Sequence, residues 1–273
     1  MQAADHGADD QSEARTLVPL ALVRRPGPLL ADGLLTHQER VSIDADRAMS
    51  QWAAYVETLR TEGWAISEVD PADDCPDAVF IEDAVVVFDD LAVVGRPAAP
   101  SRQPESQGAE DAARRAGLSI GRIEAPGTLD GGDVLKVGRR AYVGVGGRTN
   151  ASAVTQLATL LSPRGWSVQP VPVQRVLHLK SAVTALPDGT IIGYPDHVDE
   201  PAAFDRFVAM PEPEGAHVVL LGDGRLLVSS SAPKSIAELG RMGYQAIPVD
   251  ISEFEKLEGC VTCLSVRIRP VEG

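Results

Sequence analysis

The sequence predicts an α/β propeller in which about five copies of a ββαβ unit close into one ring. Three observations predict it. Glycines that end helix-like segments recur along the chain, each leads into a short apolar string, and pairs of apolar strings separated by turn residues stand between them. A unit of about fifty residues cannot bury its own sheet, so stacking the copies around a common axis provides the core.

The predicted helix ends are marked by Gly63, Gly117, Gly165 and Gly243. Glycine suits the left-handed cap that follows a helix because it has no Cβ atom. Apolar residues recur at helical spacing before two of these glycines, namely Met49, Trp52, Val56 and Leu59 before the first, and Val154, Leu157 and Leu161 before the third. The glycines are 54, 48 and 78 residues apart, so we expect one irregular copy between the third and the fourth.

Paired apolar strings indicate β-hairpins, because the Asp and Gly residues between them suit tight turns. The pairs cover residues 85–87 with 91–94, 134–135 with 141–143, 183–186 with 191–192, and 218–221 with 226–228. We expect the first strand, residues 17–23, to pair with the last, residues 261–268, and so to close the ring. A doubly wound open α/β sheet is the alternative architecture.

Length and composition indicate one globular domain. The chain has 273 residues, of which 44% are hydrophobic, and no Pro- or Ser-rich linker divides it, so we expect a single catalytic domain over residues 16–273. Residues 1–15 are polar and acidic, which predicts a mobile tail. No run approaches the ~18 apolar residues of a membrane span, and the N-terminus resembles no secretion signal, so a cytoplasmic location is expected.

The net charge of −14 argues against a nucleic-acid partner, because phosphate binding requires clustered Lys and Arg. An acidic field favours small cations instead, although acidity also serves solubility. The three cysteines are an odd number in a chain without a secretion signal, so at least one thiol is expected to be free.

Cys263 is the first residue of chemical interest. Leu264, Val266 and Ile268 follow it in alternation with polar residues, which places it at the start of the predicted last strand. With Cys260 it forms Cys-x-x-Cys, a spacing found in redox pairs and zinc sites, but no second Cys pair and no nearby His support those readings. An inert buried thiol is the plainer alternative.

Two further strings supply an imidazole and carboxylates. His178 stands between two leucines in a strand-like string, where a hydrogen-bonded core histidine is the plain reading. Asp130 opens the string Asp-Gly-Gly-Asp, which suits a tight turn. A thiol, an imidazole and a carboxylate are the groups that a thiol-nucleophile enzyme needs. Asp77, Glu82 and Asp83 add three carboxylates beside an apolar run. Taken alone they fit solvated strand ends, and together with the other strings they suggest a cationic substrate.

Taken together, six strings in order resemble the dimethylarginine dimethylaminohydrolase family of the guanidine-modifying (pentein) superfamily. They cover residues 77–83, 100–102, 128–133, 148–150, 177–181 and 261–265, and the resemblance extends over about residues 22–268. It implies a five-bladed α/β propeller with a pseudo-fivefold axis. It also implies hydrolysis of N-omega-methylated arginines (ADMA, L-NMMA) to citrulline and dimethylamine or methylamine, with no metal and no organic cofactor.

The resemblance assigns roles to individual residues. Cys263 resembles the nucleophile, His178 the general acid and base, and Asp130 the carboxylate that orients the histidine. The substrate contacts that it implies are Asp83, with Glu82 beside it, for the guanidinium group, Asp77 for the α-amino group, Arg102 and Arg148 for the α-carboxylate, and Leu34 through its backbone. Arginine suits the carboxylate because its planar fork can donate two parallel hydrogen bonds.

Two other functions stay open on the sequence alone. One is a sister enzyme, such as an arginine deiminase or another guanidine or amidine hydrolase that acts on unmodified arginine or agmatine. The other is a non-catalytic pentein-fold binding protein, similar to the ribosome anti-association factors. In the enzyme reading we expect a small cationic guanidine substrate, no nucleic-acid or membrane partner, and a monomer or homodimer.

Overall fold

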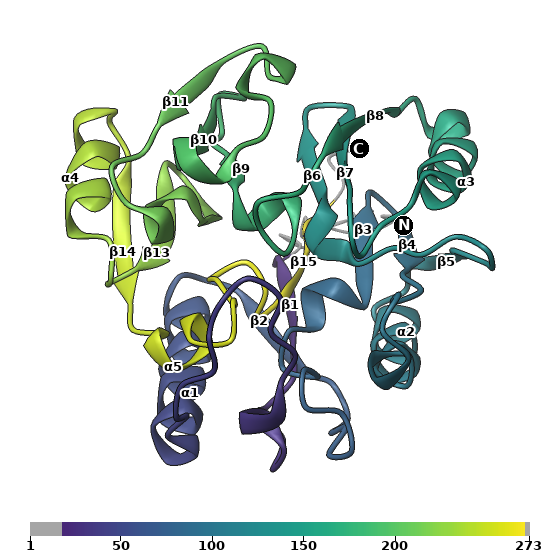
Figure 1. Cartoon of the computed structure of the whole chain (residues 1–273), viewed down its shortest axis with the longest axis horizontal. Coiled ribbons are helices and arrows are strands. Elements are labelled where there is room, and N and C mark those ends of the chain that lie inside the picture. The colour runs from purple at the N-terminus through teal and green to yellow at the C-terminus, as the bar shows by residue number, and fades with distance from the viewer. Residues whose placement is uncertain (1–17, 271–273) are drawn as a thin grey trace, which may run out of the picture.

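A computed structural model describes residues 18–270, which form five small sheets of three strands each. We call each sheet with its connecting segment a blade. Blade 1 holds β15, β1 and β2, and blades 2 to 5 hold β3–β5, β6–β8, β9–β11 and β12–β14. In every blade an antiparallel pair is followed by a parallel third strand. Figure 1 shows the blades around a common centre with the long helices outside. The predicted propeller is confirmed.

The bounds of the strands are short and regular. Blades 1 to 3 hold β15 (Val266–Ile268), β1 (Leu20–Val23), β2 (Ala65–Glu68), β3 (Val85–Phe88), β4 (Leu91–Val94), β5 (Ser119–Arg122), β6 (Val134–Val137), β7 (Arg140–Val145) and β8 (Ser167–Pro172). Blades 4 and 5 hold β9 (Val183–Ala185), β10 (Ile191–Gly193), β11 (Phe207–Ala209), β12 (Val218–Gly222), β13 (Arg225–Ser229) and β14 (Gln245–Val249).

The ring closes between the two ends of the chain. β1 pairs antiparallel with β15, with Leu20 opposite Ile268, and parallel with β2. The pairing of the first strand with the last is therefore confirmed. The open sheet is excluded because, within residues 18–270, no sheet exceeds three strands. The predicted bounds of the last strand were wrong, since residues 261–264 form a turn. Leu17 and the predicted tail over residues 1–15 lie outside the described residues.

Four long helices connect the second and third strands of blades 1, 2, 3 and 5. They are α1 (Ala45–Thr61), α2 (Glu105–Arg115), α3 (Ala151–Leu161) and α4 (Pro233–Arg241), and a short α5 (Ser252–Glu255) follows β14. Gly63, Gly117, Gly165 and Gly243 all have positive φ, as a left-handed cap requires. Met49, placed on the buried face of α1 by its spacing, is 40% exposed, because Ala48 and Tyr55 fill that face instead.

The irregular copy is blade 4. Its crossover from β10 to β11 is built from two 3-10 turns, η7 (Pro195–His197) and η8 (Pro201–Ala203), instead of an α-helix. Prolines at the first positions of both turns are compatible with a helix start and not with its interior. Without a long helix there is no cap glycine, which explains the spacing of 78 residues between Gly165 and Gly243.

The hydrophobic core consists of five clusters, each at the junction of two neighbouring blades. Between blades 2 and 3, for example, Phe88 and Val143 pack with Leu157 of α3. At the junction of blades 3 and 4, Val198 and Phe204 of the irregular crossover take the place of a helix. No helix within residues 18–270 has the length and apolar character of a bilayer span.

A 3-10 turn precedes the first strand of four blades and points toward the centre. These turns are η2 (Ile81–Asp83), η4 (Gly131–Asp133), η6 (Leu179–Ser181) and η9 (Pro213–Ala216), and blade 1 has the turn at residues 261–264 instead. The remaining 3-10 turns are η1 (Leu30–Asp32), η3 (Pro100–Arg102) and η5 (Ser162–Arg164). The turn η4 is in contact with both η2 and η6, so equivalent positions of different blades meet at the hub.

Candidate active site

One cavity at the hub gathers most of the predicted site residues. Its lining comprises Leu34, Asp77, Phe80, Asp83, Arg102, Arg148, Leu177, His178, Leu257, Glu258, Gly259 and Cys263. Seven of the nine predicted residues are among them, and we call this space the active-site cavity. Asp130 lies behind His178, and Glu82 faces away. The cavity thus joins residues that are more than 200 positions apart in the chain.

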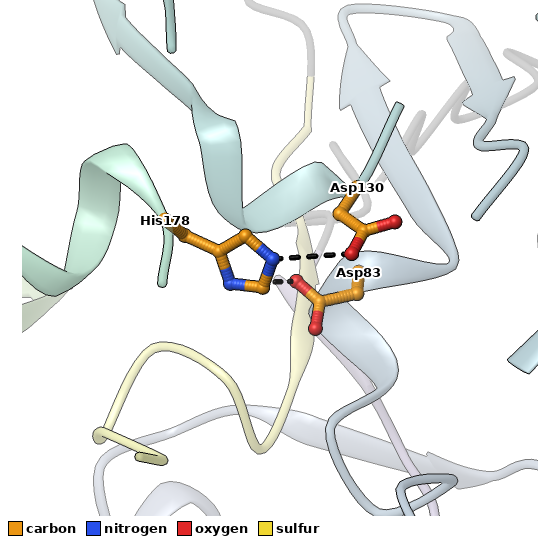
Figure 2. A group of neighbouring side chains, drawn as sticks. All are labelled: Asp83, Asp130 and His178. Carbon is orange, nitrogen blue, oxygen red and sulfur yellow. Dashed lines mark hydrogen bonds and ion pairs between the residues drawn. The ribbon is translucent and has the colours of Figure 1, made fainter. Parts of the chain in front are cut away.

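His178 lies between two carboxylates, as Figure 2 shows. Its Nε2 is 3.1 Å from Oδ2 of Asp130, and its Nδ1 is 3.7 Å from Oδ1 of Asp83. His178 has extended backbone (φ −137°) and leads into η6, so it is not part of a strand as its string suggested. A Cβ atom at Gly132 would lie 2.6 Å from Nδ1 of His178, so only glycine permits this approach.

The charges around His178 determine its protonation. Burial alone would lower its pKa, but Asp83, the hydrogen bond to Asp130 and the charge of Asp133 raise it to about 9. Burial would likewise raise the pKa of Asp83, but the positive charges of His178 and Arg102 lower it to about 2. At neutral pH His178 is therefore an imidazolium beside the ionised Asp83, and its ring can donate a proton.

Arg102 is enclosed by acids. Its Nη1 donates to Oδ2 of Asp83 at 2.8 Å, and its Nη2 and Nε donate to the carboxylate of Glu105 at 2.9–3.2 Å. All three side chains are at most 5% exposed. Burial alone would lower the pKa of Arg102, and the two carboxylates raise it instead. The predicted binding of a substrate carboxylate by Arg102 thus has to compete with both acidic partners, because Nε, Nη1 and Nη2 each already donate to one of them.

Replacement of Arg102 is expected to destabilise the fold. Arg102→Met leaves the buried Glu105 without its ion-pair partner and leaves Asp83 with His178 as its remaining cation, and breaking a buried pair typically costs about 3–5 kcal/mol. The exposed pair Arg60–Glu57 provides the control, since Arg60→Met should cost less than about 1 kcal/mol. Urea unfolding at pH 7 measures both. The loss should shrink as the pH falls, because the unpaired carboxyls then bind protons more readily in the folded state. Equal losses in the two variants would contradict the buried-pair argument.

Cys263 lies in the turn before β15 and not at the start of a strand. Its N–H donates to the carbonyl of Cys260 at 3.0 Å, which closes the turn. The two sulfurs are 3.3 Å apart and share a hydrogen bond. That bond lowers the pKa of Cys260 to about 5 and, together with burial, raises the pKa of Cys263. A proton that moves along the hydrogen bond would transfer the negative charge to Cys263, which is the sulfur that lines the cavity.

Glu82 is not in the active-site cavity. Its carboxylate is bound by Lys180 Nζ at 2.6 Å, Arg267 Nη2 at 2.5 Å and Thr262 Oγ1 at 2.7 Å. Neighbouring residues of η2 point in different directions, so Asp83 faces the cavity while Glu82 faces the opposite side of the hub. The contact with a substrate guanidinium that its sequence position suggested has no geometric support.

Leu34 belongs to a segment that covers the cavity. Its N–H donates to Oδ1 of Asp77 at 3.0 Å. Glu258 accepts from the N–H groups of Thr36 at 3.1 Å and Gln38 at 2.7 Å. Half-buried Arg148 donates to Oγ1 of Thr36 at 3.2 Å. Burial raises the pKa of Asp77, and the charge of Arg102 partly offsets this.

Several residues of the site were not predicted. Asp133 accepts from Leu179 N at 2.9 Å and from Thr149 Oγ1 at 2.6 Å, and it thereby fixes the turn that carries His178. Burial raises its pKa to about 6. Its place in the Asp-Gly-Gly-Asp string was a usable signal. Glu105 and Glu258 stand in no comparable pattern, although Glu258 has the positive φ of 59° that is uncommon outside glycine.

The cluster of Asp83, Asp130 and His178 also offers three ligand atoms within 4.8 Å of one another, the spacing of a metal site. Arg102 lies 2.8 Å from Asp83 and 4.0 Å from Asp130. A dication between these carboxylates would be repelled by the guanidinium group. The arrangement therefore suits a protonated histidine better than a metal.

Curated relatives match the chain over nearly its whole length. It is 59% identical over 249 residues to the N(G),N(G)-dimethylarginine dimethylaminohydrolase of Streptomyces coelicolor, with 91% of this chain and 96% of that protein covered. It is 33% identical over 250 residues to the enzyme of that name from Pseudomonas aeruginosa, with 90% and 98% covered.

A solved structure agrees. The Pseudomonas aeruginosa dimethylarginine dimethylaminohydrolase, in a cysteine-to-serine variant complexed with citrulline, superposes with a TM-score of 0.85 at 32% identity, over 92% of this chain and 100% of that one. No protein-family model matches the chain.

Proposed function

The chain belongs to the dimethylarginine dimethylaminohydrolase family, and we propose that it hydrolyses N-omega-methylated arginines to citrulline and dimethylamine or methylamine. The observation that carries this proposal is that Cys263, His178 and Asp83 line one cavity. A nucleophile, a proton donor and a carboxylate for a cation are the groups that this reaction requires. The substrate is a small guanidino compound, and the monomer or homodimer state and the cytoplasmic location stay predictions.

The methylated guanidinium group would bind beside Asp83, which is ionised because its pKa is about 2. Arg148 is half-buried at the cavity wall, and its fork can bind the α-carboxylate of the substrate. Asp77 is suited to the α-amino group, and Leu34 can contribute a backbone contact from the covering segment. These groups would hold the guanidinium carbon in line with the sulfur, where orientation alone lowers the barrier by several kcal/mol.

In the first half of the reaction the Cys263 thiolate attacks the guanidinium carbon and forms a C–S bond. The cationic substrate and the His178 imidazolium favour the negative charge on Cys263 over Cys260. The tetrahedral adduct then breaks its bond to the methylated nitrogen. His178 donates the proton that lets the amine leave, and Asp130 holds the ring in place through Nε2.

In the second half a water molecule replaces the amine. His178, now neutral, accepts a proton from this water, and the resulting hydroxide attacks the carbon of the thioether adduct. The C–S bond breaks and Cys263 returns to the thiolate. The hydroxyl group of the adduct loses its proton to solvent, where the released amine takes one up, and the ureido group of citrulline remains. No step oxidises or reduces the protein or the substrate, so the reaction needs only water as a second reactant.

The decisive test is mass spectrometry of protein quenched during turnover with asymmetric dimethylarginine. A substrate-derived adduct is expected on the peptide that carries Cys263, together with equal amounts of citrulline and dimethylamine. Release of ammonia from arginine at a greater rate would favour an arginine deiminase instead. Failure to turn over any guanidino compound would favour a non-catalytic binding protein.

Arg148→Gln tests the binding of the α-carboxylate. The variant is expected to raise KM by about tenfold to a hundredfold with little change in kcat, because loss of a charged hydrogen bond typically costs about 1.5–3 kcal/mol. Steady-state kinetics with asymmetric dimethylarginine measures both constants. Arg175→Gln is the control, since Arg175 is an exposed arginine outside this cavity. A change in kcat with an unchanged KM would place Arg148 in another role.

A further inference from the structure

A second and larger cavity lies on the other side of the hub. It has a volume of about 500 Å³ and is lined by β3, β6, β9, β12 and β15, so all five blades contribute a wall. We call it the hub cavity. It shares no lining residue with the active-site cavity. Its lining mixes valine and leucine residues, most of them in the innermost strands, with polar and charged residues.

The charged side chains of the hub cavity are mostly basic. Lys136, Lys180, Arg267 and Arg269 line it, and among residues 18–270 the carboxylates in its lining are Glu82 and Asp188. With all four bases protonated, this lining carries a surplus of two positive charges in a chain whose net charge is −14. Basic residues gathered in one confined space of an acidic protein raise the local concentration of anions.

At the inner end of the hub cavity, a single carboxylate, that of Glu82, pairs with two cations. Lys180 Nζ and Arg267 Nη2 both lie against Oε1 of Glu82, at 2.6 and 2.5 Å. The other oxygen of Glu82 accepts from Thr262. This carboxylate can neutralise only one of the two cations, so positive charge remains uncompensated there.

The other two cations have no acidic partner among residues 18–270. Lys136 Nζ donates to the carbonyl of Val87 at 2.6 Å, and Arg269 Nη2 donates to that of Leu220 at 2.7 Å. Asp188 is paired with Arg206 at 3.0 Å. Desolvation inside the ring, and then the charges of Lys180 and the two arginines, lower the pKa of Lys136 to about 7. That direction is expected where positive charges face each other without an anion.

We propose that the hub cavity binds a small multivalent oxyanion of the phosphate or polyphosphate class. Lys136 and Arg269 would hold it at the sides, with Lys180 and Arg267 at the inner end. Arginine and lysine are the side chains that recognise phosphate oxygens, through paired and single charged hydrogen bonds respectively.

The proposal is independent of the methylarginine reaction, so its test uses binding alone. Pyrophosphate is titrated into the full chain by calorimetry, with sodium chloride added to keep the ionic strength equal throughout. We expect saturable binding to one site, and weaker binding of inorganic phosphate because it carries less charge. The same anion should raise the melting temperature in a concentration-dependent way, as any ligand of the folded state does.

Variants locate the site. Lys136→Gln/Arg269→Gln should weaken pyrophosphate binding at least tenfold, because it removes two unpaired cations. The exposed Lys234→Gln in α4 and the active-site variant Arg148→Gln should bind as the parent protein does. Circular dichroism verifies that the double variant is folded, and Lys136→Arg should keep the affinity. Absence of saturable binding at equal ionic strength, or unchanged affinity in the folded double variant, would overturn the proposal.

Discussion

Cys263→Ser is expected to lower kcat for asymmetric dimethylarginine by about 10⁴-fold or more, the largest loss of any variant considered. A serine hydroxyl ionises far less readily than a thiol, so the imidazolium and the bound cation cannot generate its anion near neutral pH. Release of citrulline and dimethylamine measures the effect. Substrate affinity should change little, because Arg148, Asp77 and Asp83 remain in place.

Cys75→Ser is the matched control. Cys75 is also a buried free cysteine, but it does not line the active-site cavity, so its variant should keep kcat within about twofold. Turnover that survives in Cys263→Ser would refute a covalent thioether intermediate. A loss in both variants would show that the measured effect reports packing and not the nucleophile.

His178→Gln is expected to lower kcat by about 10²–10⁴-fold, the usual range for a general acid or base. His197→Gln, at a half-buried histidine outside the active-site cavity, should retain activity. The two losses at Cys263 and His178 should not add, because the residues act in the same steps. Additive losses would place the histidine outside the chemistry.

The pH dependence of kcat/KM tests the role of His178 in proton transfer, because a purely structural role would not affect it. kcat/KM should fall as the pH rises above about 9, where His178 loses its proton. Asp130→Asn removes a carboxylate that stabilises the imidazolium, so it should move this limb to lower pH. The stabilisation from the charged His178 is complete below its unfolded pKa of about 6.5 and is lost as the pH rises through its folded value. An unmoved limb in Asp130→Asn would contradict the assignment.

The repeating unit, its helix caps and its hairpin turns could be predicted from the sequence, because they depend on interactions between residues that are close in the chain. Left-handed caps at Gly63, Gly117, Gly165 and Gly243 require glycine, and hairpin turns such as Asp89–Asp90 leave a local signal. The helical spacing predicted that Met49 is buried, and this was wrong. Which residues of a helix face are covered depends on how the neighbouring blade packs against it. The irregular blade was visible only as a gap in the spacing.

Most residues that line the active-site cavity were named from the sequence, but their local structure and their contacts were not. The strings around Cys263, His178 and Asp130 predicted the chemistry through their joint resemblance to a known family, and the catalytic roles of these residues stay predictions. Their local structure was misjudged, since both Cys263 and His178 lie in turns beside strands and not within them. Backbone periodicity cannot distinguish the last residue of a turn from the first residue of a short strand.

The direction in which each side chain points was decided by the tertiary structure alone. Glu82 and Asp83 are neighbours in the sequence, yet one faces the hub cavity and the other the active-site cavity. Arg102 has a plausible role as a carboxylate ligand in the sequence, but the fold surrounds it with Asp83 and Glu105. Partners that lie far apart along the chain leave no trace in local composition.

The amino-acid sequence by itself determined the repeating unit, the closure of the ring by its two ends, and the kinds of reactive group that the chain carries. Turn chemistry, helix caps and strand patterns act over a few residues, so they can be read directly. Only the tertiary structure decided which charges share a cavity, because that depends on five blades meeting at one axis. The same convergence formed the basic hub cavity, whose cations come from β6, η6 and the segment that starts with β15.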